Sequence, residues 1–479
     1  MGVDGPAHRH RLPGLHQGGR GPTGLGGDVV EGAQLVVIPP TAPVAEPLPV
    51  GGVLFRGRRR AISQSHKAVS ITNVRLRTAR TLESGLTVDY DPFSPEVATD
   101  PLPIYRELRA AGGVHRLEQY HGWALPRFAE VWEVSCDRDS FSIVEGPVFT
   151  KDLVRRPAPA ELGPLPEGSF LSFSQMDPPA HTQIRKILYP PLRQRPVAEI
   201  EAELRRVAAE CVVAGLEQGR MDIVTELASP VSVAGTSLVL GFPPADGEEL
   251  VEYANQTMRY DDRAPAARAK IHEYLCGFVA EQRAGDCPEF IEALLGVDLA
   301  GQPFDDQEVA IQLSTLFTGG VETTPKVMGG GFIHLAANDD QRAALAQDPS
   351  LSGGAFEEML RLEVPIQHLG RTVCRPTVIG GQEMAPGDRV FLLYQSANRD
   401  EQEFGSNSEI FDLHRRPTRQ LGFGHGLHYC IGAHLARLEG RVIIEEALAR
   451  IPDFAVPADE VVRLPGSFQQ GYASVPIVF

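Results

Sequence analysis

The sequence predicts a mainly helical α+β domain, because a long series of helical patterns is followed by only a few short strand patterns. Hydrophobic residues make up 42% of the chain and charged residues 22%, which is typical of a globular protein. We find no internal repeat with a period of about 20–50 residues, which argues against solenoid and propeller architectures. With 479 residues, the chain is long enough for one large domain or for two to three smaller ones.

Proline and glycine mark the ends of the predicted helices. A helix is expected within 99–113, where proline starts it and Gly112 ends it. A strong amphipathic pattern covers 198–219 and also stops at a glycine. Further helical patterns cover 246–258, 264–284, 305–324, 339–347 and 353–363. Short strands are expected at 377–379, at 390–393 and at the C-terminus.

Residues 1–85 differ from the rest of the chain in composition. They contain eleven Lys or Arg residues against five Asp or Glu residues, and their first part is dense in Gly and Pro. A segment of this kind buries too little apolar surface to offset its ordering entropy. We interpret it as a disordered extension, or as upstream sequence included by a start assigned too early, and we take 86–479 as the functional domain. A basic arm for nucleic acid or a membrane is the alternative, but no second basic cluster supports it.

The remaining part of the chain is strongly acidic, since the net charge of the whole is −17 and the first 85 residues are positive. An acidic body repels phosphates, which argues against general nucleic-acid binding. No run of 18 consecutive apolar residues occurs and no signal-peptide core opens the chain, so we expect no membrane anchor and no secretion. Six scattered cysteines without a C-x-x-C pair are typical of a reducing compartment, so we expect a cytoplasmic protein.

The segment 421–437, LGFGHGLHYCIGAHLAR, carries the clearest chemical signal. Gly424 and Gly426 allow tight turns and a close approach of the backbone to a flat ligand. Cys430 stands just before an apolar-periodic helix that begins near Gly432, where the helix dipole favours a thiolate. Taken alone, Cys430 is either a soft metal ligand or a buried, inert cysteine.

The spacing of this segment resembles the haem-binding signature of the cytochrome P450 family, as Phe423-x-x-Gly426-x-His428-x-Cys430-x-Gly432. The resemblance implies that Cys430 is the axial thiolate ligand of the haem iron. It also places His428 at a haem propionate and Phe423 beside the sulfur.

Glu358 and Arg361 resemble the E-x-x-R motif of the same family. Their i,i+3 spacing puts both on one helix face, which alone does not distinguish them from an ordinary surface ion pair. In the family the pair is buried and joined by an arginine from the loop before the haem segment, which the resemblance assigns to Arg415. The usual histidine three residues before the Phe is Gln420 here, so the last link of this network stays open.

The segment GGVETT, which begins at Gly319, resembles the oxygen-activation segment of the family's long central helix. Glycine inside a helix costs roughly 1 kcal/mol relative to Ala, and the missing side chains leave room for haem and O2. The resemblance implies that Glu322 and Thr323 manage protons as an acid and an alcohol. The alternative is a helix end followed by a loop. Pro325 and the glycines at 329–331 predict that the second half of this helix is bent or short.

The segment DPPAHTQIR, which begins at Asp177, resembles the family's D-P-P-x-H-x-x-x-R stretch. His181 and Arg185 are four residues apart and share one helix face. The resemblance implies that both reach one propionate, where arginine gives bidentate hydrogen bonds. Arg371, ten residues after Arg361, matches a third propionate partner.

The resemblance covers 89–479, roughly 390 residues, and its four motifs agree in order. It implies a single cytochrome P450 domain in which a large helical part and a small β-rich region surround a buried haem. The implied activity is that of a soluble bacterial monooxygenase, with haem b as cofactor, O2 as co-substrate and electrons from NAD(P)H through a ferredoxin and its reductase. The reaction would hydroxylate, epoxidise or O-dealkylate a small organic molecule.

The positions of the family's pocket segments imply a mainly apolar substrate with one polar handle, of the terpenoid, aromatic, steroid or polyketide class. These segments lie near 140–172, 243–270, 315–319, 366–369 and 466–470. The pocket residues expected from them are Thr315, Thr318, Ile366, Gln367, His368 and Leu369. Glycines of the central helix and of the cysteine loop, including Gly319, Gly424 and Gly432, would lie against the haem.

The thiolate side is expected to present a basic face to an acidic ferredoxin. Its members would be Arg185, Lys186, Arg193, Arg195, Arg437 and Arg441. The protein is expected to act as a monomer, without nucleic acid. Two alternatives are a haem-thiolate peroxygenase, which the Glu322–Thr323 pair disfavours, and a haem-binding sensor without enzymatic activity.

Overall fold

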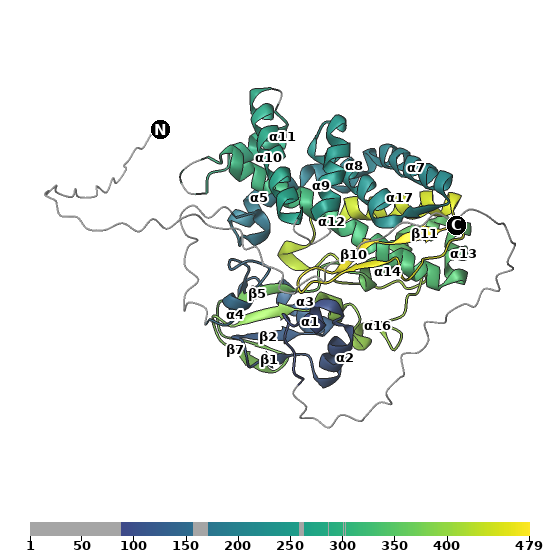
Figure 1. Cartoon of the computed structure of the whole chain (residues 1–479). Helices are drawn as coiled ribbons and strands as arrows, with labels where there is room; N and C mark the ends of the chain where they lie inside the picture. Colours follow the sequence, from purple (N-terminus) through teal and green to yellow (C-terminus); the bar gives the residue numbers. More distant parts are fainter. Residues whose placement is uncertain (1–87, 157–170, 258–262, 286, 300, 302) are drawn as a thin grey trace, which may run out of the picture. The chain divides into compact units, whose positions relative to one another are not determined.

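The structure is a computed structural model that describes residues 88–156, 171–257, 263–285, 287–299, 301 and 303–479. Every described residue belongs to the unit Thr72–Phe479 (Figure 1). The predicted N-terminal extension, 1–85, lies outside the described residues.

The described part is mainly helical with a small β region, which confirms the predicted fold class. Its α-helices are α1 (Pro95–Thr99), α2 (Leu102–Ala111), α3 (Phe128–Cys136), α4 (Lys151–Val154), α5 (Ala180–Leu188), α6 (Gln194–Glu199), α7 (Glu201–Gln218), α8 (Ser229–Leu240), α9 (Gly247–Thr257), α10 (Arg263–Ala284), α11 (Glu289–Leu295), α12 (Asp306–Ala337), α13 (Asp339–Gln347), α14 (Ser352–Leu362), α15 (Tyr394–Ala397), α16 (Glu401–Phe404) and α17 (Ala433–Arg450). Short 3-10 turns are η1 (Phe173–Gln175), η2 (Pro190–Leu192), η4 (Pro244–Asp246), η5 (Pro349–Leu351) and η6 (Gly426–His428), and η3 (Ile223–Ala228) is a π-helix.

The helix ends predicted from the glycines at 112 and 219 agree closely with these bounds. Gly112 follows α2, and Gly219 ends α7 in the left-handed conformation, with a φ of 69°. The pattern at 198–219 is divided in the structure, because α6 ends at Glu199 and α7 begins at Glu201. Periodicity therefore located the helices well, but it did not reveal this break.

The central helix α12 runs from Asp306 to Ala337 as one element. It starts at a capping box in which Asp305 and Glu308 exchange hydrogen bonds between side chain and backbone. The prediction that its second half is short is wrong, because the helix continues through Pro325 and the following glycines. Burial of its apolar side chains offsets the roughly 3 kcal/mol that a proline costs inside a helix.

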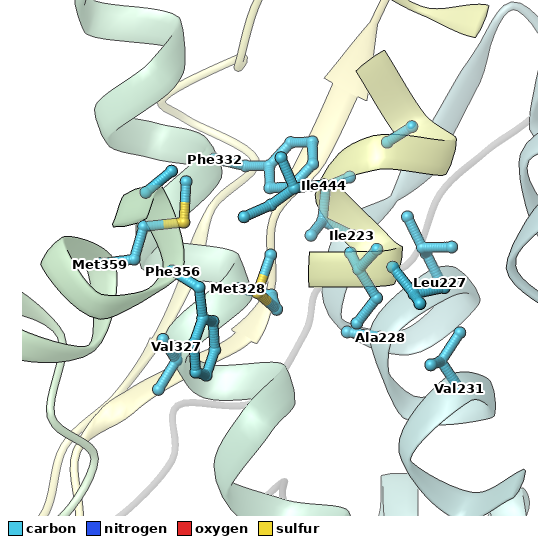
Figure 2. Close-up of a cluster of buried hydrophobic side chains, with 14 of the residues drawn as sticks. Ile223, Leu227, Ala228, Val231, Val327, Met328, Phe332, Phe356, Met359 and Ile444 are labelled. Atoms are coloured by element: carbon cyan, nitrogen blue, oxygen red, sulfur yellow. The ribbon is translucent and has the colours of Figure 1, made fainter. Parts of the chain in front are cut away.

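The second half of α12 packs in the largest apolar cluster of the domain. Figure 2 shows Val327, Met328 and Phe332 of α12 beside Phe356 and Met359 of α14, and all five are buried. Apolar contacts of this kind, and not the local propensity of the sequence, determine where the helix ends.

The glycines at 329–331 bring α12 close to its neighbours. A Cβ on Gly330 would lie 2.4 Å from Cγ of Glu363, and a Cβ on Gly331 would lie 2.4 Å from Sδ of Met359. These distances are far below van der Waals contact, so glycine is required by packing and does not act here as a helix breaker.

A small five-stranded sheet lies apart from this cluster, in the order β1-β2-β8-β5-β3. Its strands β2 and β8 are parallel, and the other neighbours are antiparallel. Three two-stranded pairs complete the β region, β9 with β10, β4 with β11 and β6 with β7. The bounds are β1 (His115–Leu117), β2 (Gly122–Leu125), β3 (Phe141–Ser142), β4 (Arg220–Asp222), β5 (Leu369–Val373), β6 (Thr377–Ile379), β7 (Gln382–Met384), β8 (Arg389–Leu392), β9 (Val462–Leu464), β10 (Gly471–Ser474) and β11 (Pro476–Val478).

One stretch, Ile223–Leu240, is long and apolar enough by composition to cross a membrane. Most of its residues are buried in the domain, where α8 packs against α7, α12 and α17. Figure 2 places Ile223, Leu227 and Val231 of this stretch in the same buried cluster as α12. Its apolar composition is therefore accounted for by the protein core.

Candidate active site

The loop at 421–432 crosses the end of α3 before it leads into α17. Gly424 and Gly426 have φ angles of 66° and 73°, which residues with side chains rarely adopt. A Cβ on Gly426 would also lie 2.0 Å from the carbonyl oxygen of Ser135. Glycine is thus required at this position by both the backbone angle and the contact.

Cys430 stands near the end of this loop, and its backbone N–H donates to the carbonyl of Phe423 at 2.9 Å. Burial raises the pKa of the Cys430 thiol, whereas the backbone N–H of Gly432 and the guanidinium groups of Arg185 and Arg437 lower it. Burial prevails, so the pKa of the thiol lies above its ordinary value, and the hydrogen bond and the nearby cations partly offset this rise.

The Cys430 side chain lines a cavity of about 330 Å³, a volume typical of sites for small molecules. Residues of α12 line the same cavity at a spacing of four, namely Thr315, Gly319 and Thr323. Most of the other lining residues are apolar, among them Leu240, Leu316, Val327, Val364, Ile366 and Leu369.

Two arginines and two histidines gather at this cavity. Arg185, Arg371 and His428 line it, and the ring of His181 lies 4.4 Å from that of His428. His181 is fully buried, and neither of its ring nitrogens has a hydrogen-bond partner among the described residues. Burial and the neighbouring Arg371, His181 and Arg185 lower the pKa of His428 to about 2.

These residues fit a cofactor that has a flat apolar body and anionic side groups. A buried cluster of this charge is costly unless an anion compensates it, and buried ring nitrogens require hydrogen-bond partners. Haem has two propionates for such a cluster, an apolar macrocycle for the cavity and an iron that binds a thiolate such as that of Cys430. The site is therefore chemically matched to haem.

Glu358 and Arg361 of α14 form a fully buried ion pair. Arg361 donates to Glu358 through Nε at 2.8 Å and through a terminal nitrogen at 2.7 Å. Arg415 reaches the same carboxylate at 3.1 Å, so the structure brings the three residues together. Gln420 instead donates its amide to Glu357, the residue before Glu358.

Glu322 and Thr323 are neighbours on α12 with different surroundings. Thr323 lines the cavity, and its hydroxyl donates to the carbonyl of Gly319 at 2.7 Å. Glu322 is only 2% exposed, and its carboxylate lies 3.8 Å from Nζ of Lys326 and 3.9 Å from the guanidinium of Arg268. The structure thus places the alcohol at the cavity and the acid beside two cations.

Three of the six predicted pocket residues line the cavity, namely Thr315, Ile366 and Leu369. Thr318, Gln367 and His368 are not among the residues of the described part that line this cavity. Thr318 does not share the four-residue spacing of Thr315, Gly319 and Thr323, so it lies on a different face of α12. The Gln367 amide donates to backbone carbonyls, and the buried His368 ring packs edge-on against an aromatic ring.

The predicted basic face is partly neutralised by acidic neighbours. Arg437 pairs with Glu357 at 2.5 Å, and Arg441 pairs with two glutamates. Arg185 is directed inward, where it donates to a backbone carbonyl at 2.6 Å. The exposed members of the face are Lys186, Arg193 and Arg195.

Two buried polar residues near the cavity, Lys326 and Glu439, were not predicted from the sequence. Lys326 follows Glu322 by four residues, so the helical spacing could have revealed this pair. Glu439 of α17 lines the cavity, and burial raises the pKa of its carboxyl group to about 8. No local pattern distinguishes Glu439 from the other polar residues of its helix, so only the fold reveals it.

The cysteine at the cavity, the apolar lining and the cluster of arginines and histidines define a haem-thiolate oxidoreductase. A family model described as Cytochrome P450 matches residues 353–460. Cytochrome P450 130 of Mycobacterium tuberculosis is 31% identical over 408 residues, which cover 82% of this chain and 99% of the relative. Linalool 8-monooxygenase of Pseudomonas putida is also 31% identical over 408 residues, which cover 81% of this chain and 98% of the relative.

Solved structures show the same similarity over nearly their whole lengths. Cytochrome P450 CYP109Q5 from Chondromyces apiculatus has a TM-score of 0.69 and 29% identity, and the match covers 82% of this chain and 98% of that one. CYP268A2 of Mycobacterium marinum, solved with pseudoionone, has a TM-score of 0.70 and 27% identity, covering 84% and 100%. The chain belongs to the cytochrome P450 family of haem b-dependent monooxygenases, which use O2 and electrons that reach them from NAD(P)H through partner proteins.

Proposed function

We propose that this protein oxidises a mainly apolar small organic molecule, with Cys430 as the axial ligand of its haem. The observation that carries the proposal is that Cys430 lines the same cavity as Thr323 and two arginines, Arg185 and Arg371. One cavity thus combines a thiolate ligand, a proton-handling hydroxyl and cations for the propionates.

When bound, haem supplies the redox chemistry that activates O2. Arg185 and Arg371 would hold its propionates through charge-assisted hydrogen bonds, and His181 and His428 would add ring nitrogens. Phe423, whose ring faces the Arg437 guanidinium at 4.6 Å, would close the thiolate side together with Gly424 and Gly432 of the same loop.

Glu322 and Thr323 would hold and move protons on the other side of the cavity. The Thr323 hydroxyl already donates to the carbonyl of Gly319, so its oxygen is left to accept a hydrogen bond from the cavity. Glu322 is buried, but its partner Arg268 has a side chain that is 44% exposed. Arg268 therefore connects the buried acid to the surface, from which protons are taken up.

The lining of the cavity favours a terpenoid or steroid over a strongly polar substrate. Apolar residues such as Leu240 and Leu369 predominate in it, and polar side chains such as those of Thr236, Thr315 and Gln469 are interspersed among them. The named substrates of three related proteins are linalool, a steroid and vitamin D(3), which belong to the same range of polarity. A screen for shifts of the haem spin state on addition of such compounds tests this choice, and binding confined to polar compounds would refute it.

The absorption spectrum of the reduced, CO-bound protein tests the ligand directly. A haem-thiolate gives a distinctive long-wavelength band, which we expect in the protein and not in Cys430→Ser. A band that persists in the variant would exclude Cys430 as the ligand. A peroxygenase would instead oxidise substrate with hydrogen peroxide and without reduction, and a sensor would oxidise nothing.

We also propose that an acidic ferredoxin docks on the exposed cations Lys186, Arg193 and Arg195. Replacing Arg193 and Arg195 by Glu should slow reduction by ferredoxin and flatten its salt dependence, because attraction between surface charges is screened by salt. Lys270→Glu, on the exposed side of α10, is the matched control. Equal rates in both variants at low and high salt would refute the proposal.

We propose, finally, that 86–479 is the functional domain of a cytoplasmic monomer. A chain shortened to 86–479 should bind haem as fully as the whole chain, and it should sediment as a monomer. Loss of haem binding on truncation would show that the N-terminal extension belongs to the domain.

A further inference from the structure

The side chain of Gln312 joins the central helix to a segment that forms part of the cavity wall. Gln312 precedes Thr315 and Leu316 on α12 by three and four residues, and both of these line the cavity, so the three share one helix face. The Gln312 amide oxygen accepts from the backbone N–H of Phe173 at 2.7 Å, and its amide nitrogen donates to the carbonyl of Leu171 at 2.9 Å. Gln312 is 1% exposed, so water competes little for these hydrogen bonds.

The segment that Gln312 holds contributes to two parts of the site. Phe173 and Ser174 of η1 line the cavity, and Phe173 is buried in an apolar cluster that also contains Phe317 of α12. The ring of Phe173 lies 6.2 Å from that of His181, one of the residues expected at the propionates. Because η1 has three residues, its own backbone hydrogen bonds give it little stability. Its position therefore depends on the contacts that attach it to the rest of the domain.

Glutamine is chemically specific for this contact. The N–H of Phe173 needs an acceptor and the carbonyl of Leu171 needs a donor, and a primary amide supplies both from one end of the side chain. Methionine has nearly the same length but supplies neither hydrogen bond with comparable strength. Asparagine has both groups but is one methylene shorter, so it cannot reach the two backbone groups together. Gln312 thus fixes the place of η1 relative to α12 and does more than fill space.

We propose that Gln312 is a positioning residue that fixes the cavity wall at Phe173 and Ser174 to α12, and that it thereby sets the size of the molecules that the cavity accepts. The inference deepens the proposed function, on which it rests for the identity of the cavity as the substrate site. A fixed wall keeps its apolar contacts with a small substrate and excludes a bulky one. A loosened wall gives up some of these contacts and admits the bulky molecule, so selectivity changes more than overall affinity.

The chain offers a matched control in Gln341 of α13. The Gln341 amide oxygen accepts from the backbone N–H of Leu413 at 2.6 Å, and its amide nitrogen donates to the carbonyl of Phe411 at 3.2 Å. Gln341 therefore holds two backbone groups two residues apart, as Gln312 does. These three residues are not among those of the described part that line the cavity. Gln341→Met thus removes the same type of contact at a different place.

Hydrogen exchange at the Phe173 amide in the holoenzyme tests the positioning. Exchange is followed by mass spectrometry at single-residue resolution, and it should be roughly 5- to 150-fold faster in Gln312→Met, because a buried N–H left without its acceptor makes local opening easier. In Gln341→Met the acceleration should appear at Leu413 and not at Phe173. An unchanged rate at Phe173 in Gln312→Met would overturn the inference. If Gln312→Met does not bind haem, Gln312→Asn takes its place.

Two probes of different size test the selectivity, namely linalool and the bulkier vitamin D(3), which two relatives name as their substrates. Their dissociation constants are measured from the shift of the haem spin state. In Gln312→Met the ratio of the two constants should move toward vitamin D(3) by about tenfold, which is the effect of a lost or gained contact in an apolar pocket. In Gln341→Met the ratio should stay the same.

An unchanged ratio in Gln312→Met would overturn the inference, and so would equal changes in Gln312→Met and Gln341→Met. A purely structural role predicts these results, because a general loss of stability weakens the binding of both probes alike. If neither compound binds to the original protein, the proposed substrate class fails. The exchange rate at Phe173 then decides by itself whether Gln312 fixes the wall.

Discussion

Replacing Glu358 by Gln should destabilise the domain severely, although the two side chains have nearly the same shape. The Glu358 carboxylate is fully buried and accepts two hydrogen bonds from Arg361, one from Arg415 and one from the backbone N–H of Asp412. A carboxamide keeps one oxygen acceptor, but it turns an NH2 group toward arginine donors. Arg361, which is also fully buried, is then left with the backbone carbonyls of Asn398 and Ser408 as acceptors and without its counter-charge.

The expected cost follows from this burial. Removing one partner of a buried ion pair typically costs about 3–5 kcal/mol, because the remaining charge stays desolvated. We expect Glu358→Gln to lie in that range, measured as the shift of the urea midpoint of the holoenzyme at unchanged slope. Far-UV circular dichroism reports the unfolding.

Glu357→Gln is the matched control, because it makes the same chemical change one residue away. Glu357 and its partner Arg437 have side chains that are 28% and 38% exposed, so this pair should contribute about 0–1 kcal/mol. A loss below about 1 kcal/mol in Glu358→Gln, or equal losses in the two variants, would refute the reasoning that burial sets the magnitude.

Two further predictions concern the cysteine loop and α17. Gly426→Ala should lower the free energy of unfolding by about 1–3 kcal/mol and reduce the haem bound per chain, because its Cβ would meet the Ser135 carbonyl and its φ is 73°. The control is Gly353→Ala, which should bind haem normally because its Cβ would meet nothing within 4 Å. Equal haem contents in the two variants would contradict the prediction. Glu439 has a pKa raised from 4.5 to about 8, so the folded protein binds the extra proton and its stability should fall by up to about 1.4 kcal/mol per pH unit as the pH rises from 4.5 to 8. Urea unfolding across this range should show a shallower fall in Glu439→Gln, and identical slopes in both proteins would exclude this assignment.

The sequence predicted the helices better than the strands, for a physical reason. A helix such as α7 has one buried face, which appears as a period of 3.6 residues. The strands β2 and β8 are buried over all four of their residues, so no alternation marks them, and only β8 was predicted, from its apolar run at 390–393. Their pairing also joins segments more than 260 residues apart, which a local pattern does not report.

The site was predicted where a motif keeps its residues close in the chain. Cys430 and His428 stand in one loop, and Glu358 and Arg361 stand on one turn of helix. The environment of Glu322 depends instead on distant residues, because Gln469 reaches Lys326 from the C-terminal part of the chain. Contacts of this kind are produced by packing and have no signature in local spacing.

The length of α12, which was predicted to be shorter, determines which residues lie near Glu322. Local propensity favours a helix that ends at Pro325, and Lys326 would then lie outside it. Packing of the glycines at 329–331 against neighbouring side chains carries the helix onward, and this places Lys326 one turn from Glu322. The close approach of α12 to α14 therefore does more than stabilise the core. It also keeps the buried Lys326 beside Glu322, more than two helical turns from the glycine at 331 where α12 meets α14.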